Sequence, residues 1–332
     1  MSTSSQLFDE TIASSYVNLI DERLGAQILS VSDEFFAPAV RMLDPKPAVF
    51  HPGKFDDHGQ YMEGWESRRK RVAGYDWCIV QLGLAGKIVG VDIDTSHFTG
   101  NYPVAASIDA CCVNKEEKPD NWQEILHAVT LGPNAHHFHA ITVEDHWTHI
   151  RLNIYPDGGI ARLRVYGIVQ PSEDRFKEEV DLLALENGGR AIAANDEHYG
   201  NPWTLLHPGR GINMDDGWQT RRRRLPGNDW CLLALGKRGR ISRIVLDTAH
   251  FKGNFPDTCI IQAADVTIDN NKSLVTQSMF WQTLLSEQKL TMDAIHIYDK
   301  EQINDLGPIT HVRINIIPDG GLSRVRLFGR VE

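Results

Sequence analysis

Short runs of apolar and β-branched residues recur along the chain, separated by turns rich in glycine and proline. They predict strands at residues 78–82, 88–93, 105–113, 139–143, 148–155 and 161–168. The runs do not alternate with helical patterns, so a parallel sheet with crossover helices is not expected. The pattern predicts an all-β fold of the sandwich type. An acidic stretch at residues 172–187 predicts a short amphipathic linker helix that ends at Gly188.

Most of this pattern occurs twice. Residues 94–103 read DTSHFTGNYP and residues 247–256 read DTAHFKGNFP, with seven of ten positions identical. Residues 148–159 and 310–321 agree at nine of twelve positions. Two copies of this length indicate a duplicated domain rather than a solenoid. The repeat predicts one sandwich over residues 1–170 and a second over residues 171–332, which begins with the linker helix.

The repeated ten-residue stretch follows a predicted strand in both copies and ends in a Gly-Asn-aromatic-Pro turn. Its histidine, His97 or His250, is a candidate general acid or base, which Asp94 or Asp247 could orient. The further polar candidates for substrate binding are Thr95, Asn101, Thr248 and Asn254. The alternative is a structural role, because aspartate, threonine and asparagine fasten turns through their own side chains and a histidine can bond its own loop.

Alternation along residues 148–155 predicts that Arg151 and Asn153 point away from the core. Arg313 and Asn315 do the same in the second copy. The Pro-Asp-Gly-Gly sequence that follows predicts a hairpin turn, which would bring the arginines of residues 161–168 to the same face. Arginine suits bidentate carboxylate binding, so this face is a candidate substrate-binding surface. A solvated face or an interface is the alternative.

A basic run follows a tryptophan in both copies, as RRKR at residues 68–71 and RRRR at residues 221–224. The candidates for an anion site are Arg68, Arg69, Arg221 and Arg222. Internal ion pairs or a solvated face are the alternatives. Glu66 lies between the tryptophan and the arginines of the first copy, whereas the second copy has Gln219 there. This carboxylate, present in one copy only, predicts a functional asymmetry.

Composition narrows the classes of function. Of the 332 residues, 42% are apolar and 23% are charged, as in soluble globular proteins. The formal net charge of -10 argues against general nucleic-acid binding, and no apolar run is long enough for a membrane span. The N-terminus lacks the apolar region of a signal peptide and the five cysteines show no metal-type spacing, so we expect the cytoplasm. The histidine patch at residues 136–139 has no counterpart in the second copy, so no metal site is predicted.

The doubled motifs together resemble the allantoicase family. They are WESRR at residues 65–69, DWC at residues 76–78, the DTSHFTGNYP loop and the Pro-Asp-Gly-Gly turn, and the resemblance covers residues 15–332. It implies two tandem jelly-roll β-sandwich repeats of the galactose-binding-like type, assembled into a homo-oligomer. It also implies hydrolysis of allantoate to ureidoglycolate and urea in purine breakdown, for nitrogen supply. No cofactor is implied as required, and a role for a divalent metal stays open.

The resemblance also implies roles for the candidate residues. An arginine would hold the carboxylate of allantoate, while asparagine, threonine and backbone groups would bind its ureido groups. His97 or His250 would transfer protons, assisted by Asp94, Asp247 or by Glu66. Two alternatives stay open at this point: a non-catalytic tandem carbohydrate-binding module, and an enzyme that acts on ureidoglycolate.

Overall fold

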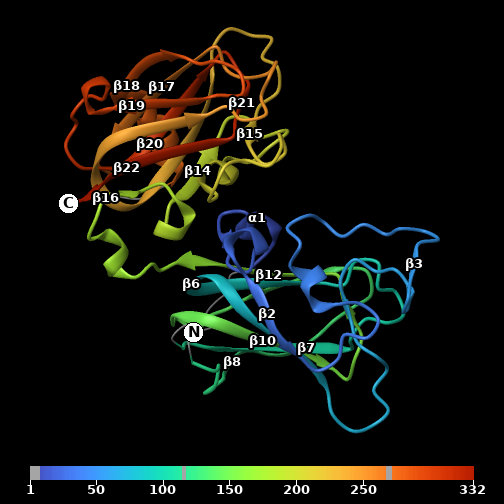
Figure 1. Ribbon diagram of the computed structural model, residues 1–332. Helices are drawn as coiled ribbons and strands as arrows, with labels where there is room; N and C mark the ends of the chain where they lie inside the picture. Colours follow the sequence, from blue (N-terminus) through green and yellow to red (C-terminus); the bar gives the residue numbers. More distant parts are fainter. Residues whose placement is uncertain (1–7, 114–116, 267–270) are drawn as a thin grey trace. The chain divides into compact units, whose positions relative to one another are not determined.

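The computed structural model describes residues 8–113, 117–266 and 271–332. The chain divides into two compact units, residues 1–170 and 171–332, and each is described by itself (Figure 1). Within the described ranges, none of the helices has the length and apolar character needed to cross a membrane.

The first unit consists of α1 (Glu10–Ala13), β1 (Val17–Asn18), η1 (Glu22–Leu24), β2 (Gln27–Val31), η2 (Ala39–Leu43), β3 (Phe55–Asp56), β4 (Gly59–Gln60), β5 (Trp65–Glu66), β6 (Asp76–Asp94), β7 (Ala105–Cys111), β8 (Gln123–Thr130), β9 (His136–Ala140), β10 (Trp147–Tyr155), β11 (Gly159–Ile160) and β12 (Arg162–Val169).

Strand β6 is the central element of the first unit. Its first half pairs antiparallel with β2 and β10, and its second half pairs antiparallel with β9 and β12. Strands β7 and β8 continue the sheet beyond β10, and β1 lies beyond β12. One long strand therefore takes part in both layers of a jelly-roll sandwich, and it ends where the loop at residues 94–103 begins.

The two layers enclose an apolar core. Ile150, Leu152 and Ile154 of β10 are fully buried, as their alternation along the strand predicts. Leu163 and Val165 of β12 are fully buried as well. Each such side chain contributes roughly 1.5–3 kcal/mol when removed from water, so this core supplies most of the stabilisation of the scaffold.

The second unit repeats this arrangement around β16. Its first half pairs with β14 and β20, and its second half pairs with β19 and β22. The all-β prediction with two tandem sandwich repeats is thereby confirmed. The unit consists of η3 (Glu173–Phe176), β13 (Val180–Asp181), η4 (Leu185–Asn187), β14 (Arg190–Ala194), η5 (Pro202–Leu206), β15 (Trp218–Gln219), β16 (Asp229–Asp247), β17 (Thr258–Ala264), α2 (Asn271–Gln277), η6 (Ser278–Phe280), β18 (Gln282–Lys289), β19 (Ile295–Asp299), η7 (Lys300–Gln302), β20 (Ile309–Ile317), β21 (Gly321–Leu322) and β22 (Arg324–Val331).

The predicted linker helix at residues 172–187 is wrong. That segment forms two single turns, η3 and η4, on either side of the short strand β13. β13 pairs with β22, and Leu182 and Leu183 beside it are fully buried. Edge pairing and burial outweigh the weak helical preference of the stretch. Gly188 does end η4, in the left-handed conformation with φ 90°.

The predicted hairpin at Pro-Asp-Gly-Gly is also wrong. Strands β10 and β12 each pair with β6, in different layers, and the turn between them leads into β11, which pairs with β5. A Cβ added to Gly159 would lie 1.9 Å from the ring of Phe98, so this glycine is required by close packing. Arg162 and Arg164 consequently donate to backbone carbonyls of residues 41–63 instead of joining the face of β10.

Candidate active site

The loop at residues 94–103 is held by its own polar side chains. Thr95 Oγ1 donates to the carbonyl of Gly132 at 2.7 Å, and Asp94 Oδ1 accepts from a loop N–H at 2.7 Å. Thr248 and Asp247 make the matching contacts in the second unit, at 2.6 Å and 2.8 Å. In the structure, these four candidate residues therefore hold the backbone of the two loops in place through hydrogen bonds.

His97 and His250 serve the same purpose. Both have a left-handed φ of 70°. His97 Nε2 lies 3.1 Å from the carbonyl oxygen of Ala48, and His250 Nε2 lies 2.7 Å from that of Gly211. A carbonyl only accepts, so each Nε2 donates and ties the loop to the segment before β5 or β15. The aspartate three residues earlier bonds the loop backbone instead, so the expectation that it orients the imidazole is wrong.

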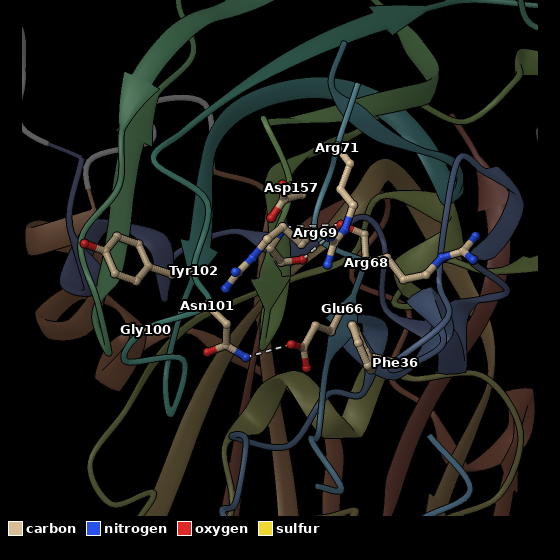
Figure 2. Close-up of a pocket in the computed structure, with 11 residues that line it drawn as sticks. Phe36, Glu66, Arg68, Arg69, Arg71, Gly100, Asn101, Tyr102 and Asp157 are labelled. Atoms are coloured by element: carbon tan, nitrogen blue, oxygen red, sulfur yellow. Dashed lines mark hydrogen bonds between the residues drawn. The ribbon is translucent and has the colours of Figure 1, made fainter. Parts of the chain in front are cut away.

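The first unit has a pocket of about 730 Å³ beside this loop (Figure 2). Four segments meet there: the segment after β2 that carries Phe36, β5 with the basic run that follows it, the tip of the 94–103 loop and the turn before β11. The lining residues are Phe36, Glu66, Ser67, Arg68, Arg69, Arg71, Gly100, Asn101, Tyr102, Asp157 and Gly158. Among the candidate residues, the structure thus brings Glu66, Arg68, Arg69 and Asn101 together and leaves His97 outside.

Glu66 is one of two carboxyl groups in this pocket, beside Asp157, and its pKa is raised. Its Oε1 accepts a hydrogen bond from Asn101 Nδ2 at 2.7 Å (Figure 2). Burial raises the pKa of Glu66 above its ordinary value, and the Asn101 hydrogen bond offsets this only in part. A carboxyl group that keeps its proton to a higher pH than a free glutamate suits general acid–base chemistry.

Three arginines line the pocket, and they differ in their partners. Arg68 Nη2 lies 2.6 Å from Asp33 Oδ2, and the Arg68 guanidinium lies 5.1 Å from the ring centre of Phe35. Arg69 and Arg71 form neither an ion pair nor a side-chain hydrogen bond with any residue that the structure describes. In Figure 2 the Arg68 side chain extends away from the other two. Arg69 and Arg71 are therefore the cations available to an anionic ligand.

The second unit has an equivalent pocket of about 420 Å³. Its lining residues are Tyr199, Gln219, Thr220, Arg222, Gly253, Asn254, Phe255, Asp257, Pro318, Asp319 and Gly320. Of the candidate residues, Arg222 and Asn254 lie in it, whereas Arg221 is paired with an aspartate oxygen 2.7 Å away. Gln219 occupies the place that Glu66 has in the first pocket, so this pocket lacks the titratable glutamate.

Arg151 and Asn153 lie elsewhere, on the outer face of β10. Arg151 Nη2 and Asn153 Nδ2 lie 2.8 Å and 2.9 Å from Asp109 Oδ2. Arg313 Nε donates to Asn315 Oδ1 at 2.9 Å in the second unit. These four candidate residues line neither pocket and serve the outer face of the sheet.

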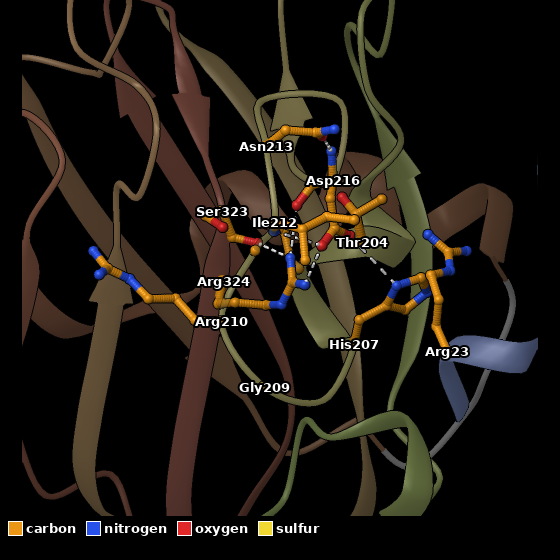
Figure 3. Close-up of polar contacts among 12 residues, drawn as sticks. Arg23, Thr204, His207, Gly209, Arg210, Ile212, Asn213, Asp216, Ser323 and Arg324 are labelled. Carbon is orange, nitrogen blue, oxygen red and sulfur yellow. Dashed lines mark hydrogen bonds and ion pairs between the residues drawn. The ribbon is translucent and has the colours of Figure 1, made fainter. Parts of the chain in front are cut away.

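A buried ion pair holds the segment at residues 207–216 of the second unit (Figure 3). Arg324 Nη2 lies 2.6 Å from Asp216 Oδ2, with side-chain exposures of 4% and 9%. Burial acts to raise the pKa of Asp216, but hydrogen bonds from a histidine and from Arg324 lower it well below its usual range. Arg162 makes the matching pair with Glu63 at 3.0 Å in the first unit. These pairs fix the segments to which the loop histidines are bonded.

Within the described ranges, no group of three or more His, Cys, Asp or Glu side chains is arranged to hold a metal ion. The histidine patch falls on β9. There His136 Nδ1 lies 2.7 Å from Asp92 Oδ2, and His137 bonds backbone groups through both ring nitrogens. These contacts give two of the histidines structural roles.

Fold and site together define a class of protein: a duplicated jelly-roll β-sandwich with a small polar pocket at the loop end of each repeat. The family model of the allantoicase repeat matches residues 17–170 and again residues 180–332. The chain therefore belongs to the allantoicase family.

Relatives and solved structures agree with this assignment. The chain is 57% identical over 322 residues to a protein named probable allantoicase 2 from Burkholderia pseudomallei, covering 95% of both chains. It is 55% identical over 323 residues to a probable allantoicase from Pseudomonas savastanoi, covering 96% of this chain and 97% of that protein. The crystal structure of allantoicase from Saccharomyces cerevisiae matches with a TM-score of 0.81 at 36% identity, covering 95% of this chain and 94% of that one.

Proposed function

We propose that the protein is an allantoicase, which hydrolyses allantoate to ureidoglycolate and urea in the pocket of the first unit. The observation that carries this proposal is one pocket, in a member of the allantoicase family, that combines a carboxyl group of raised pKa with two guanidinium groups that have no ion-pair partner among the described residues. Glu66 and Asn101 form the polar pair, and Arg69 and Arg71 supply the positive charge.

The chemistry of allantoate matches these groups. Its central carbon carries one carboxylate and two ureido groups. Arg69 and Arg71 bind the carboxylate, and Asn101 binds a ureido group. Protonated Glu66 donates its proton to the ureido nitrogen as the C–N bond breaks and urea leaves. A water oxygen forms the new bond to that carbon and returns a proton to Glu66, which leaves ureidoglycolate as the second product.

Urea release from allantoate by the purified protein tests the proposal. Arg69→Ala should raise KM by roughly 10- to 100-fold, because a hydrogen bond to a charged group contributes about 1.5–3 kcal/mol. Arg238→Ala is the matched control, since Arg238 is exposed and pairs with Asp265 on the surface. A protein that releases no urea from allantoate, or that prefers ureidoglycolate as substrate, would overturn the assignment.

We also propose that the enzyme works in the cytoplasm as a homo-oligomer and requires no metal. All five cysteines are free, which suits a reducing compartment. Light scattering checks the oligomeric state, and a monomer would contradict it. Activity that survives dialysis against EDTA is expected; activity that is lost and then restored by a divalent cation would contradict the absence of a metal requirement.

A further inference from the structure

The pocket of the second unit keeps the frame of the first but carries different chemistry. Gln219 stands where Glu66 stands in the first pocket, and Arg222 stands where Arg69 does. Asn254, the counterpart of Asn101, has only a weak contact, with its Nδ2 at 3.9 Å from a methionine sulfur. The first pocket joins the Asn101 amide to the Glu66 carboxylate, whereas in the described part of the chain the amide groups of Gln219 and Asn254 form no comparable side-chain hydrogen bond.

We propose that this second pocket is a non-catalytic binding site for small carboxylates that carry ureido or amide groups. The inference rests on the proposed function, because it assigns to the second pocket the ligand class of the first. Arg222 binds the carboxylate of the ligand, and Gln219 and Asn254 form hydrogen bonds with its amide groups. A glutamine side chain does not titrate in the physiological range, so this pocket lacks the acid–base group that the proposed function assigns to Glu66 in the first.

The charges of the pocket favour an anion at Arg222. Arg222 is exposed and has no ion-pair partner within the described part of the chain. The two carboxylates in the lining are already engaged: Asp319 Oδ2 accepts from the N–H of Arg223 at 2.8 Å, and Asp257 pairs with Lys289. Arg222 is thus the guanidinium group among the described lining residues that can meet an incoming carboxylate, whereas Asp319 keeps a negative charge that accepts only a backbone N–H.

The frame of this pocket is held by the same contacts as that of the first. Gly321 N–H donates to the carbonyl of Asn254 at 2.8 Å, as Gly159 N–H donates to that of Asn101 at 2.7 Å. A Cβ on Gly321 would lie 2.1 Å from the ring of Phe251, which is fully buried. The volume of about 420 Å³ lies within the range of small-molecule sites. A pocket held in this way is preorganised for a ligand.

Calorimetric titration of allantoate into the full-length Glu66→Gln variant tests the inference, since this variant is expected to consume the probe roughly 10²–10⁴-fold more slowly than the wild-type enzyme. We expect two binding sites per chain. Adding Arg222→Ala should remove one site or weaken it at least tenfold, and adding Arg69→Ala instead should weaken the other roughly 10- to 100-fold. Arg222 is exposed, so its substitution should leave the fold intact; Asn254→Ala provides a second variant, and circular dichroism checks both.

Fewer than two sites in the Glu66→Gln protein, or two sites that survive both Arg222→Ala and Asn254→Ala, would overturn the inference. Urea release by the wild-type protein decides the proposed function separately. A wild-type enzyme that hydrolyses allantoate and a variant with one site would refute the second pocket only. A protein that releases no urea but binds allantoate at two sites would refute the catalytic assignment only.

Discussion

In the Glu66→Gln variant, the first pocket should keep its shape and lose only its titratable group. The Gln oxygen can still accept the 2.7 Å hydrogen bond from Asn101, so substrate binding should change little. A positioned acid–base group contributes roughly 10²–10⁴-fold to turnover. We therefore expect kcat to fall by about that factor, or roughly 3–5 kcal/mol in the barrier, with KM within a few-fold of wild type.

The assay is urea release at saturating allantoate. Glu144→Gln is the matched control, because it makes the same chemical change at an exposed carboxylate whose partner is Lys87. The control should turn over like the wild-type enzyme. If Glu66→Gln retains kcat within threefold of wild type, Glu66 is not the acid–base group and the mechanism proposed for this pocket fails.

The pKa of Glu66 adds a test of stability. Its pKa in the folded protein lies above the ordinary value of 4.5, mainly because of burial. The protonated group therefore favours the folded state below pH 4.5, and this contribution is lost as pH rises through the raised value. Glutamine does not ionise. The free energy of unfolding of Glu66→Gln minus that of the wild-type protein should therefore be more positive at pH 8 than at pH 4. Urea denaturation at the two pH values measures this, and an equal difference at both would contradict it.

Three further predictions concern the scaffold. His97→Asn should keep turnover within a few-fold, because asparagine tolerates a positive φ and only a loop tether is lost; a loss of kcat as large as that of Glu66→Gln would instead make the histidine catalytic. Gly159→Ala should cost about 1–3 kcal/mol in the free energy of unfolding, since its Cβ would overlap the buried Phe98 ring, and unchanged denaturation would contradict this. Asp216→Asn should lower the free energy of unfolding by about 3–5 kcal/mol at pH 7, because it leaves Arg324 without its carboxylate partner. The pKa of Asp216 is depressed on folding, so the difference from wild type should shrink as pH falls below about 4. A difference that does not depend on pH would contradict the ion pair.

Local patterns predicted the elements of this fold better than the pairing between them. Alternation identified the core face of β10, because burial follows the period of a strand. Residues 78–82 and 88–93 were predicted as separate strands, yet they are halves of β6, since the intervening residues continue the strand from one layer to the other. The partners of β10 and β12 depend on that long-range arrangement, which the Pro-Asp-Gly-Gly motif does not encode.

Only part of the candidate site could be predicted, because contacts between distant segments are not encoded in local sequence patterns. Glu66 and Asn101 were predicted as site residues because their surroundings are repeated; both line the pocket, and their hydrogen bond joins positions 35 residues apart in the sequence. Arg71 and Tyr102 were missed as pocket residues, although both lie in repeated motifs. The sequence does not show which arginine of the basic run is free to bind a ligand. Arg68 differs from Arg71 because the folded chain brings Asp33 to Arg68. His97 was favoured for its chemistry, while its left-handed backbone and its bond to a carbonyl were not visible.

The duplication itself separates scaffold from chemistry. The aspartate, threonine and histidine that are identical in the two loops all fasten backbone, with the same hydrogen bonds in each unit. Several pairs differ between the two pocket linings, among them Tyr102 and Phe255, and the change from Glu66 to Gln219 replaces a carboxyl group by an amide that does not titrate. The loop beside each pocket has the same hydrogen bonds in both units. The same scaffold can therefore support acid–base chemistry in one pocket and ligand binding without catalysis in the other. Under the proposed function, the aspartate, threonine and histidine that are identical in the two loops shape the pockets, and the difference between Glu66 and Gln219 decides which pocket carries out the reaction.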